Sequence, residues 1–257
     1  MKRRRNRNRQ QNPDEAIAMT AVFVHEKVLE ITSTLPKGRI LDIPCGQGAL
    51  AENLSKQGFE IFCEDYDSAN YRFHGGNFHR LDRNCNLPYK DETFDCVTSV
   101  EGIEHIGNPH LLIREIARVL KDGGHLVITT PNIMNIKSRL YFLLRSHFRY
   151  FKYFPQAGNQ HELLGLHINP ISFSELSYML NRYAFHIKTI SCNRFIKNIL
   201  YSCLFLKPLI FMMTRRKNNE ADVLLKLELL YGDILIISAK KDIYSSFSYK
   251  NNFNVIK

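Results

Sequence analysis

Short apolar runs bounded by turn residues recur along the chain, and most are too short for helices. A continuous apolar run of four to eight residues is typical of a strand that is buried on both faces of a parallel sheet. Between these runs, apolar positions recur at helical spacing. The predicted strands cover residues 40–43, 59–65, 77–81, 94–100, 125–131, 185–190 and 234–241.

The helical segments alternate with these strands, which predicts an α/β fold built on an open sheet. Asn12 and Pro13, followed by two acids, are typical of a helix start, so a first helix is predicted from Asn12 to Leu35. Gly75 and Gly76 leave little room for a helix between the second and third strands. Further helices are predicted at 49–57, after Asn108, at 136–144 and after Ser172.

Charge is unevenly distributed along the 257 residues, whose formal net charge is +10. Six lysines and arginines lie within residues 1–11, which contain no apolar residue after Met1, so this tail is predicted to be disordered. We interpret it as a solvated tail, with contact to anionic lipid or nucleic acid as the alternative. Residues 12–242 are predicted to form one domain, with 243–257 as a loose C-terminal tail.

Six cysteines occur without any C-x-x-C pair, and several lie in predicted strands. This pattern favours reduced, buried thiols in a cytoplasmic protein, and it predicts no metal site. The basic start is followed by Asp14 and Glu15 and by no A-x-A cleavage site, so export is not expected.

The first strand leads into a glycine turn and a helix start at residues 46–51. Gly46, Gly48 and Ala51 fit the dinucleotide pattern G-x-G-x-x-A, and Asp65 stands about 20 residues further on, as that fingerprint requires. Asp42, at the end of the strand, separates two interpretations. Its carboxylate would repel a pyrophosphate, whereas it would hold a cation or an ammonium group.

The order acid-x-x-x-Gly-x-Gly resembles motif I of class I S-adenosylmethionine (SAM)-dependent methyltransferases, although Pro44 stands where that family more often has glycine. Later segments are also similar to the family: Leu87-Pro88-Tyr89, Phe94-Asp95, residues 99–106 and the Asp122-Gly123-Gly124 turn. The resemblance implies a seven-stranded, mostly parallel Rossmann-like sheet with helices on both faces. It also implies an antiparallel last strand. The residues before that strand predict a helical insert at 191–230.

The same resemblance implies SAM as the cofactor and places its site at the carboxyl ends of the strands. Asp65 would accept hydrogen bonds from the ribose hydroxyls, and Asp82 would accept a hydrogen bond from the adenine amino group. Arg83 is a weaker candidate for contact with the adenine. The predicted cofactor-binding residues are Asp42, Cys45, Gly46, Gly48, Asp65, Tyr66, Asp82, Arg83 and Glu101.

No catalytic residue is assigned by these patterns. Glu104 and His105 follow the fourth strand, and we interpret them as shaping the cofactor side of the pocket, with a general base role for His105 as the alternative. His161, Glu162 and His167 lie in the region that supplies acceptor contacts in the family. His105, His161 and His167 are therefore the weak catalytic candidates.

The implied reaction is methyl transfer to an oxygen or nitrogen of a small-molecule, sugar or lipid-linked acceptor. Residues 130–132, 138–140 and 167–172 are similar to bacterial methyltransferases of polysaccharide and glycolipid biosynthesis. The apolar stretch 199–217 is too short and too interrupted to span a bilayer. It is interpreted either as a contact with the membrane surface or as a hairpin packed on the fold or on a second subunit.

Two other functions remain open at this level. An NAD(P)-dependent oxidoreductase is supported by residues 46–51, and a nucleic-acid-binding scaffold without catalysis is supported by the basic tail. The chain has no aromatic-basic stacking motif of an RNA-binding sheet, so nucleic acid is not the expected partner. The pattern does not predict the oligomeric state.

Overall fold

The computed structural model describes residues 16–82, 86–151, 166–196 and 226–242. Arg83, His161 and Glu162 lie outside the described residues, as do the predicted tails at 1–11 and 243–257 and the apolar stretch 199–217. Among the described residues, no helix has both the length and the apolar character needed to cross a bilayer.

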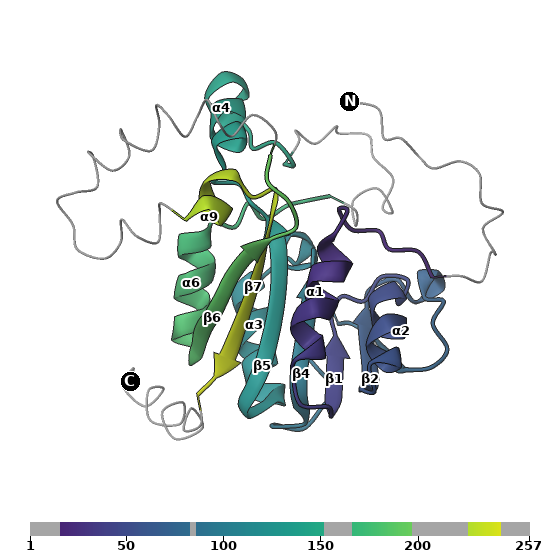
Figure 1. The fold of residues 1–257 in the computed structure, drawn as a ribbon. Coiled ribbons are helices and arrows are strands. Elements are labelled where there is room, and N and C mark those ends of the chain that lie inside the picture. Colours follow the sequence, from purple (N-terminus) through teal and green to yellow (C-terminus); the bar gives the residue numbers. More distant parts are fainter. Residues whose placement is uncertain (1–15, 83–85, 152–165, 197–225, 243–257) are drawn as a thin grey trace.

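A seven-stranded sheet forms the centre of the molecule, in the order β3-β2-β1-β4-β5-β7-β6 (Figure 1). β7 is antiparallel to both of its neighbours, and the other pairs are parallel. The predicted mostly parallel sheet with an antiparallel last strand is therefore confirmed. The strands are β1 (Arg39–Asp42), β2 (Glu60–Asp65), β3 (Asn77–Arg80), β4 (Phe94–Val100), β5 (Leu120–Pro131), β6 (Phe185–Cys192) and β7 (Ile234–Lys241).

Helices cover both faces of the sheet, and each face has its own apolar core. α1 and α2 pack on one face, where Val28 and Leu54 are fully buried, and α3 and α6 pack on the other, where Ile116 and Leu180 are fully buried. Each such side chain contributes about 1.5–3 kcal/mol to folding through burial. The longer helices are α1 (Val24–Ser33), α2 (Ala49–Lys56), α3 (Pro109–Val119), α4 (Ile136–Arg145) and α6 (Phe173–Arg182).

Short helical turns complete the architecture, and two longer helices begin where the sequence predicts. The Asn108 side chain accepts from Leu111 N at 3.2 Å at the start of α3, and Ser172 Oγ accepts from Glu175 N at 3.1 Å at the start of α6. The short elements are η1 (Ser68–Asn70), η2 (Ile103–His105) and α9 (Leu227–Tyr231), which precedes β7 and lies partly within the predicted insert.

The first helix begins at Val24, so the prediction of helix from Asn12 is wrong for the described residues 16–23. Two backbone N–H groups in this segment are bound by side chains that are distant in the sequence. Ile17 N donates to Gln47 Oε1 at 2.9 Å, and Ala21 N donates to Glu101 Oε2 at 2.6 Å. The segment is consequently held across the end of the sheet as a loop.

Two further elements differ from the expected pattern. Residues 121–124, predicted as a turn after α3, belong to β5, where the pairing shifts between Phe94 and Cys96. In α4, Leu143 and Leu144 are 77% and 73% exposed, so the helix does not bury these two apolar side chains against the described residues.

Candidate functional site

A cavity of about 500 Å³ lies at the carboxyl ends of β1, β2 and β4. Ligands of open α/β sheets bind at this edge, where the loops after neighbouring strands meet. Residues 17–20, ahead of α1, close one side of the cavity. The wall consists of residues 17–20, His25, Asp42, Pro44, Cys45, Gly46, Gln47, Ala49, Leu50, Asp65, Tyr66, Asp67, Asn70, Val100, Glu101, His105, Ile106 and His167.

The turn between β1 and α2 depends on two glycines with positive φ. Gly46 has φ of 54° and lines the cavity, and no atom lies within 4 Å of where a Cβ would stand. Gly48 has φ of 88°, and a Cβ there would lie 2.6 Å from Phe73 Cβ. Side chains are therefore excluded at Gly48 both by backbone conformation and by packing.

Asp42, at the end of β1, presents a carboxylate that is only 1% exposed and lines the cavity. Thr98 Oγ1 on β4 donates to its Oδ1 at 2.7 Å. Burial raises the Asp42 pKa to about 7, the Thr98 hydrogen bond opposes this shift, and the charge of Asp65 adds to it. The structure thus leaves this carboxylate without a paired cation among the described residues.

Asp65 ends β2 and connects two loops of the cavity wall. Its Oδ2 accepts from Gly46 N at 2.7 Å, and its Oδ1 accepts from Asp67 N at 2.9 Å. Burial raises its pKa, and these backbone hydrogen bonds oppose the shift. Each carboxylate oxygen has two acceptor sites, so Asp65 retains the capacity to accept further hydrogen bonds from a ligand.

Glu101 follows β4 and holds the loop of residues 16–23 in place. Its side chain accepts from Ala21 N, and its backbone N donates to Thr129 Oγ1 at 2.8 Å. Burial raises the pKa of the Glu101 carboxyl. The next residue, Gly102, packs tightly on Pro44, because a Cβ there would lie 2.0 Å from Pro44 Cδ.

The thiol of Cys45 lines the same cavity. Its pKa is raised, first by the hydrogen bond with Cys63 and then by burial, so the thiol stays protonated. Cys45, Cys63 and Cys96 are free and buried, as predicted, whereas Cys192 is free but only half-buried.

The wall of the cavity is acidic. Four carboxylates line it, and no lysine or arginine does among the residues that the structure describes. Charges buried without partners are costly, so such a wall favours a ligand that brings positive charge. The carboxylates belong to Asp42, Asp65, Asp67 and Glu101.

The structure brings most of the predicted cofactor-binding residues to this wall, but not all. Gly48 stands behind the loop as the residue before α2, where it contacts Phe73. Asp82 is exposed, and its Oδ2 accepts from Asn86 Nδ2 at 3.1 Å, away from the cavity wall.

Several residues of the wall were not selected from the sequence. Gln47 and Asp67 lie beside predicted positions, but their types carry no specific signal. Residues 17–20 were assigned to a helix, whereas they reach the cavity as a loop. The hydrogen bonds of Ile17 and Ala21 to side chains far along the chain explain this error.

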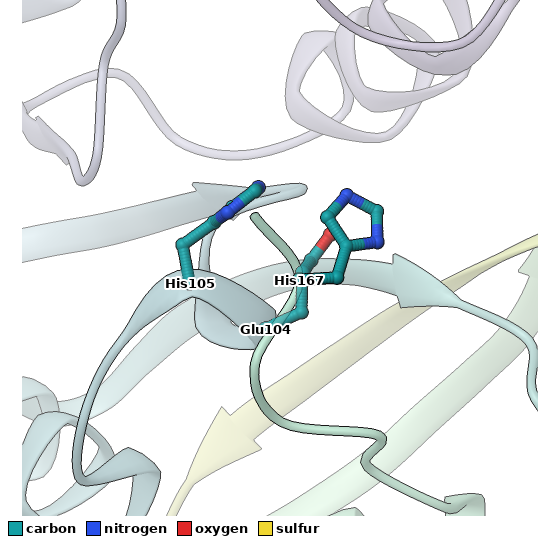
Figure 2. Close-up of side chains that lie close together, drawn as sticks. All are labelled: Glu104, His105 and His167. Carbon is teal, nitrogen blue, oxygen red and sulfur yellow. The ribbon is translucent and has the colours of Figure 1, made fainter. Parts of the chain in front are cut away.

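Glu104, His105 and His167 form a cluster at the cavity edge, with their side chains close together (Figure 2). One ligand atom from each residue lies within 4.8 Å of those of the others. Burial raises the Glu104 pKa to about 8 and lowers the pKa of both histidines, that of His167 to about 4. Each of the three residues was singled out from the sequence, but their proximity was not predicted.

A second hollow of similar volume lies at the opposite, amino-terminal end of the sheet. Two ion pairs lie in its wall: Lys121 Nζ lies 2.6 Å from Asp95 Oδ1, and Arg39 Nε lies 3.0 Å from Glu60 Oε2. This hollow therefore carries charges of both signs, and the acidic cavity remains the candidate site.

The sequence matches the family model described as a methyltransferase domain over residues 9–189, which is more than half of the chain. The chain is 32% identical over 168 residues to the ubiquinone biosynthesis O-methyltransferase of Aliivibrio fischeri, covering 61% of this chain and 68% of that protein. The enzyme of the same name from Vibrio parahaemolyticus is 29% identical over 187 residues, covering 60% and 77%.

Solved structures show the same architecture. A SAM-dependent methyltransferase from Archaeoglobus fulgidus superposes with a TM-score of 0.54 at 20% identity, covering 84% of this chain and 94% of that one. At this identity the likeness establishes the fold. The shared fold agrees with the strand order and with the antiparallel last strand described above.

Proposed function

Since this chain belongs to the methyltransferase domain family, we propose that it transfers a methyl group from SAM to a hydroxyl oxygen of a small organic acceptor. The observation that carries the proposal is the cavity at the carboxyl ends of the strands. It is lined by four carboxylates and, among the described residues, by no lysine or arginine. SAM carries a sulfonium and an ammonium group and no phosphate, so its charge complements this wall.

The individual positions fit the cofactor. The Asp42 carboxylate is buried and lines the cavity, and an ammonium group would supply the cation that it lacks among the described residues. Asp65 retains acceptor capacity for ribose hydroxyls beside the Gly46 turn. The cavity volume of about 500 Å³ lies within the range of small-molecule sites.

A dinucleotide fits the same wall poorly. Its pyrophosphate would approach the Gly46 turn, where Asp42 and Asp65 present carboxylates instead of a positive group. The sheet order also differs from the dinucleotide-binding order 3-2-1-4-5-6, because β7 lies between β5 and β6. We therefore favour methyl transfer over hydride transfer.

The protein contributes to the reaction mainly by alignment. When bound, SAM supplies a methyl group that is already activated by the positive sulfur. Placing donor and acceptor in line is worth about 7–11 kcal/mol of the barrier. The Gly102 contact with Pro44 and the Gly46 bond to Asp65 fix the loops that hold the donor. The chain thus provides a rigid frame for one displacement step.

The acceptor is proposed to bind toward the part of the wall that carries His105 and His167, which leaves the Gly46 turn with Asp42 and Asp65 to SAM. The names of the relatives support oxygen as the methylated atom. A sugar or lipid-linked acceptor, as expected from residues 130–132, 138–140 and 167–172, stays a prediction.

Methyl transfer from labelled SAM to three matched acceptors tests this proposal. The panel contains an aromatic diol, a monosaccharide and an aromatic amine, and the product is located by NMR. We expect label on oxygen, with loss of transfer in Asp42→Asn and retention in Asp95→Asn, which alters the amino end of the sheet. Label on nitrogen would contradict O-methylation, and binding of NAD in place of SAM would contradict the whole proposal.

A further inference from the structure

The cluster of Glu104, His105 and His167 combines one carboxylate and two imidazoles from two segments of the chain (Figure 2). Glu104 and His105 lie in η2, directly after β4, and His167 lies in the segment before α6. Three protein ligands of these types, with one side open, are the donor set of catalytic zinc sites and of other divalent transition metal sites.

Two atoms of the cluster are buried without a hydrogen-bond partner among the described residues. They are Oε1 of Glu104 and Nδ1 of His167. A buried polar atom without a partner costs about 1–3 kcal/mol, so native proteins rarely leave two of them side by side. Oε2 of Glu104 accepts from Thr130 Oγ1 at 3.3 Å, which orients the carboxylate and leaves Oε1 available.

The tautomer of His105 is fixed by its surroundings. Its Nδ1 lies 2.8 Å from the Leu166 carbonyl oxygen, which only accepts, so Nδ1 carries the proton. In the neutral ring, Nε2 then presents a lone pair. Histidines that bind metals commonly donate their other ring N–H to a backbone carbonyl in this way.

The two segments are held together by backbone hydrogen bonds, so the cluster is preorganised. Ile168 N and Asn169 N both donate to the Glu104 carbonyl oxygen, at 2.9 and 3.0 Å, and the Asn169 side chain donates to Ile106 O. Together with the His105 contact, these bonds fix the position of His167 relative to Glu104.

We propose that Glu104, His105 and His167 bind a divalent transition metal ion, such as Zn²⁺, at the acceptor side of the cavity. His105 and His167 both line the cavity, so the open coordination positions would face the ligand space. Glu101, a further carboxylate of the same wall, adds negative charge near Glu104. No metal site was predicted from the sequence, because His167 lies far along the chain from Glu104 and His105.

The ion would activate the acceptor of the proposed methyl transfer, and this role depends on that proposed function. A divalent ion stabilises the deprotonated form of a bound hydroxyl, as it lowers the pKa of bound water to about 7. The hydroxyl proton leaves to water, and the oxygen attacks the methyl carbon. The new O–C bond forms as the C–S bond breaks, and the electron pair of that bond remains on the sulfur.

Calorimetric titration of the full chain with Zn²⁺, after treatment with EDTA, tests the site. We expect one ion per chain, with affinity reduced at least about 10-fold in His167→Ala and in Glu104→Gln. The glutamine variant keeps the side-chain volume and the oxygen that accepts a hydrogen bond from Thr130. A loss of affinity in this variant therefore reports the missing ligand atom, even if His167→Ala fails to fold. His125→Ala, which removes a histidine from β5 outside the cavity wall, is the matched control and should bind as the unchanged chain does.

Co²⁺ provides a second readout, because its visible absorption changes with the number and geometry of its ligands. Absence of one-to-one binding, or equal affinity in His167→Ala and His125→Ala, would overturn the proposal and would favour a hydrogen-bonded network with water. SAM binding to the EDTA-treated chain is measured in parallel. SAM binding without ion binding would overturn the metal site alone, whereas ion binding without SAM binding would support the site and overturn the proposed function.

Discussion

The two ends of the sheet differ in whether their carboxylates are paired with cations. At the amino ends of the strands, Asp95 pairs with Lys121 and accepts from Arg39 N at 2.9 Å, which lowers its pKa. At the carboxyl ends, Asp42 and Glu104 are buried without a cationic partner among the described residues, and their pKa values are raised to about 7 and 8. One end is neutralised by the protein itself, and the other is not.

This difference indicates where a ligand is needed. An unpaired buried carboxylate destabilises the folded chain, whereas a ligand with positive charge recovers the lost interaction on binding. The unpaired carboxylates of the acidic end therefore lower the stability of the folded chain and raise its affinity for a cationic ligand. Substitutions at the two ends should separate these two properties.

The largest effect is expected for the affinity of Asp42→Asn for SAM. Removing one partner of a buried charge pair costs about 2–5 kcal/mol, which is roughly a 30- to 4000-fold loss of affinity. The amide retains the oxygen that accepts from Thr98, so the fold is kept. Calorimetry with SAM measures the change, and an affinity within threefold of the original would exclude Asp42 as the ammonium partner.

The same substitution should increase stability at high pH. The Asp42 pKa rises from 3.8 to about 7 on folding, so ionising this group favours the unfolded chain by up to roughly 4 kcal/mol above pH 7. Asparagine removes that penalty. Urea unfolding should show Asp42→Asn as the more stable protein at pH 8, with the difference shrinking toward pH 4. A difference in unfolding free energy that stays constant from pH 4 to pH 8 would contradict the raised pKa of Asp42.

Gly48→Ala tests the packing of the loop behind the cavity. The added Cβ would lie 2.6 Å from Phe73 Cβ, in a backbone conformation with φ of 88°. We expect a loss of about 1–3 kcal/mol in the free energy of unfolding and weaker SAM binding. Gly107→Ala, at a position with no atom within 4 Å of the added Cβ, is the control for a general effect of replacing glycine.

The smallest effect is expected at the amino end. Asp95→Asn removes the partly exposed pair with Lys121, and such pairs contribute about 0–1 kcal/mol. The pKa of Asp95 is lowered on folding, so this contribution is present near neutral pH and is lost as the pH falls through the folded pKa. SAM affinity should not change; a tenfold loss would show that the two ends are coupled.

Local patterns in the sequence were sufficient to predict the strands of the sheet and the part of the site formed by Asp42, Gly46 and Asp65. Asp42, Gly46 and Asp65 stand at or just after the ends of predicted strands, and parallel strands bring their carboxyl ends together. Their positions therefore followed from strand order alone.

The rest of the site depends on contacts between residues that are distant in the sequence. His105 meets the Leu166 carbonyl across 61 residues, and Ala21 N is bound by Glu101 across 80. Hydrophobic periodicity is local and carries no information on such contacts. The cluster with His167 was therefore not predicted, and residues 16–23 were assigned to a helix. Asp82 stays a prediction for adenine binding, because it follows the family pattern but lies away from the cavity wall.

The central claim is that the acidic end of the sheet binds a cationic methyl donor. Calorimetric titration of the purified chain with SAM and, separately, with NAD tests it most directly. We expect one SAM to bind per chain and no measurable binding of NAD. Binding of NAD, or absence of SAM binding in a folded sample, would contradict it.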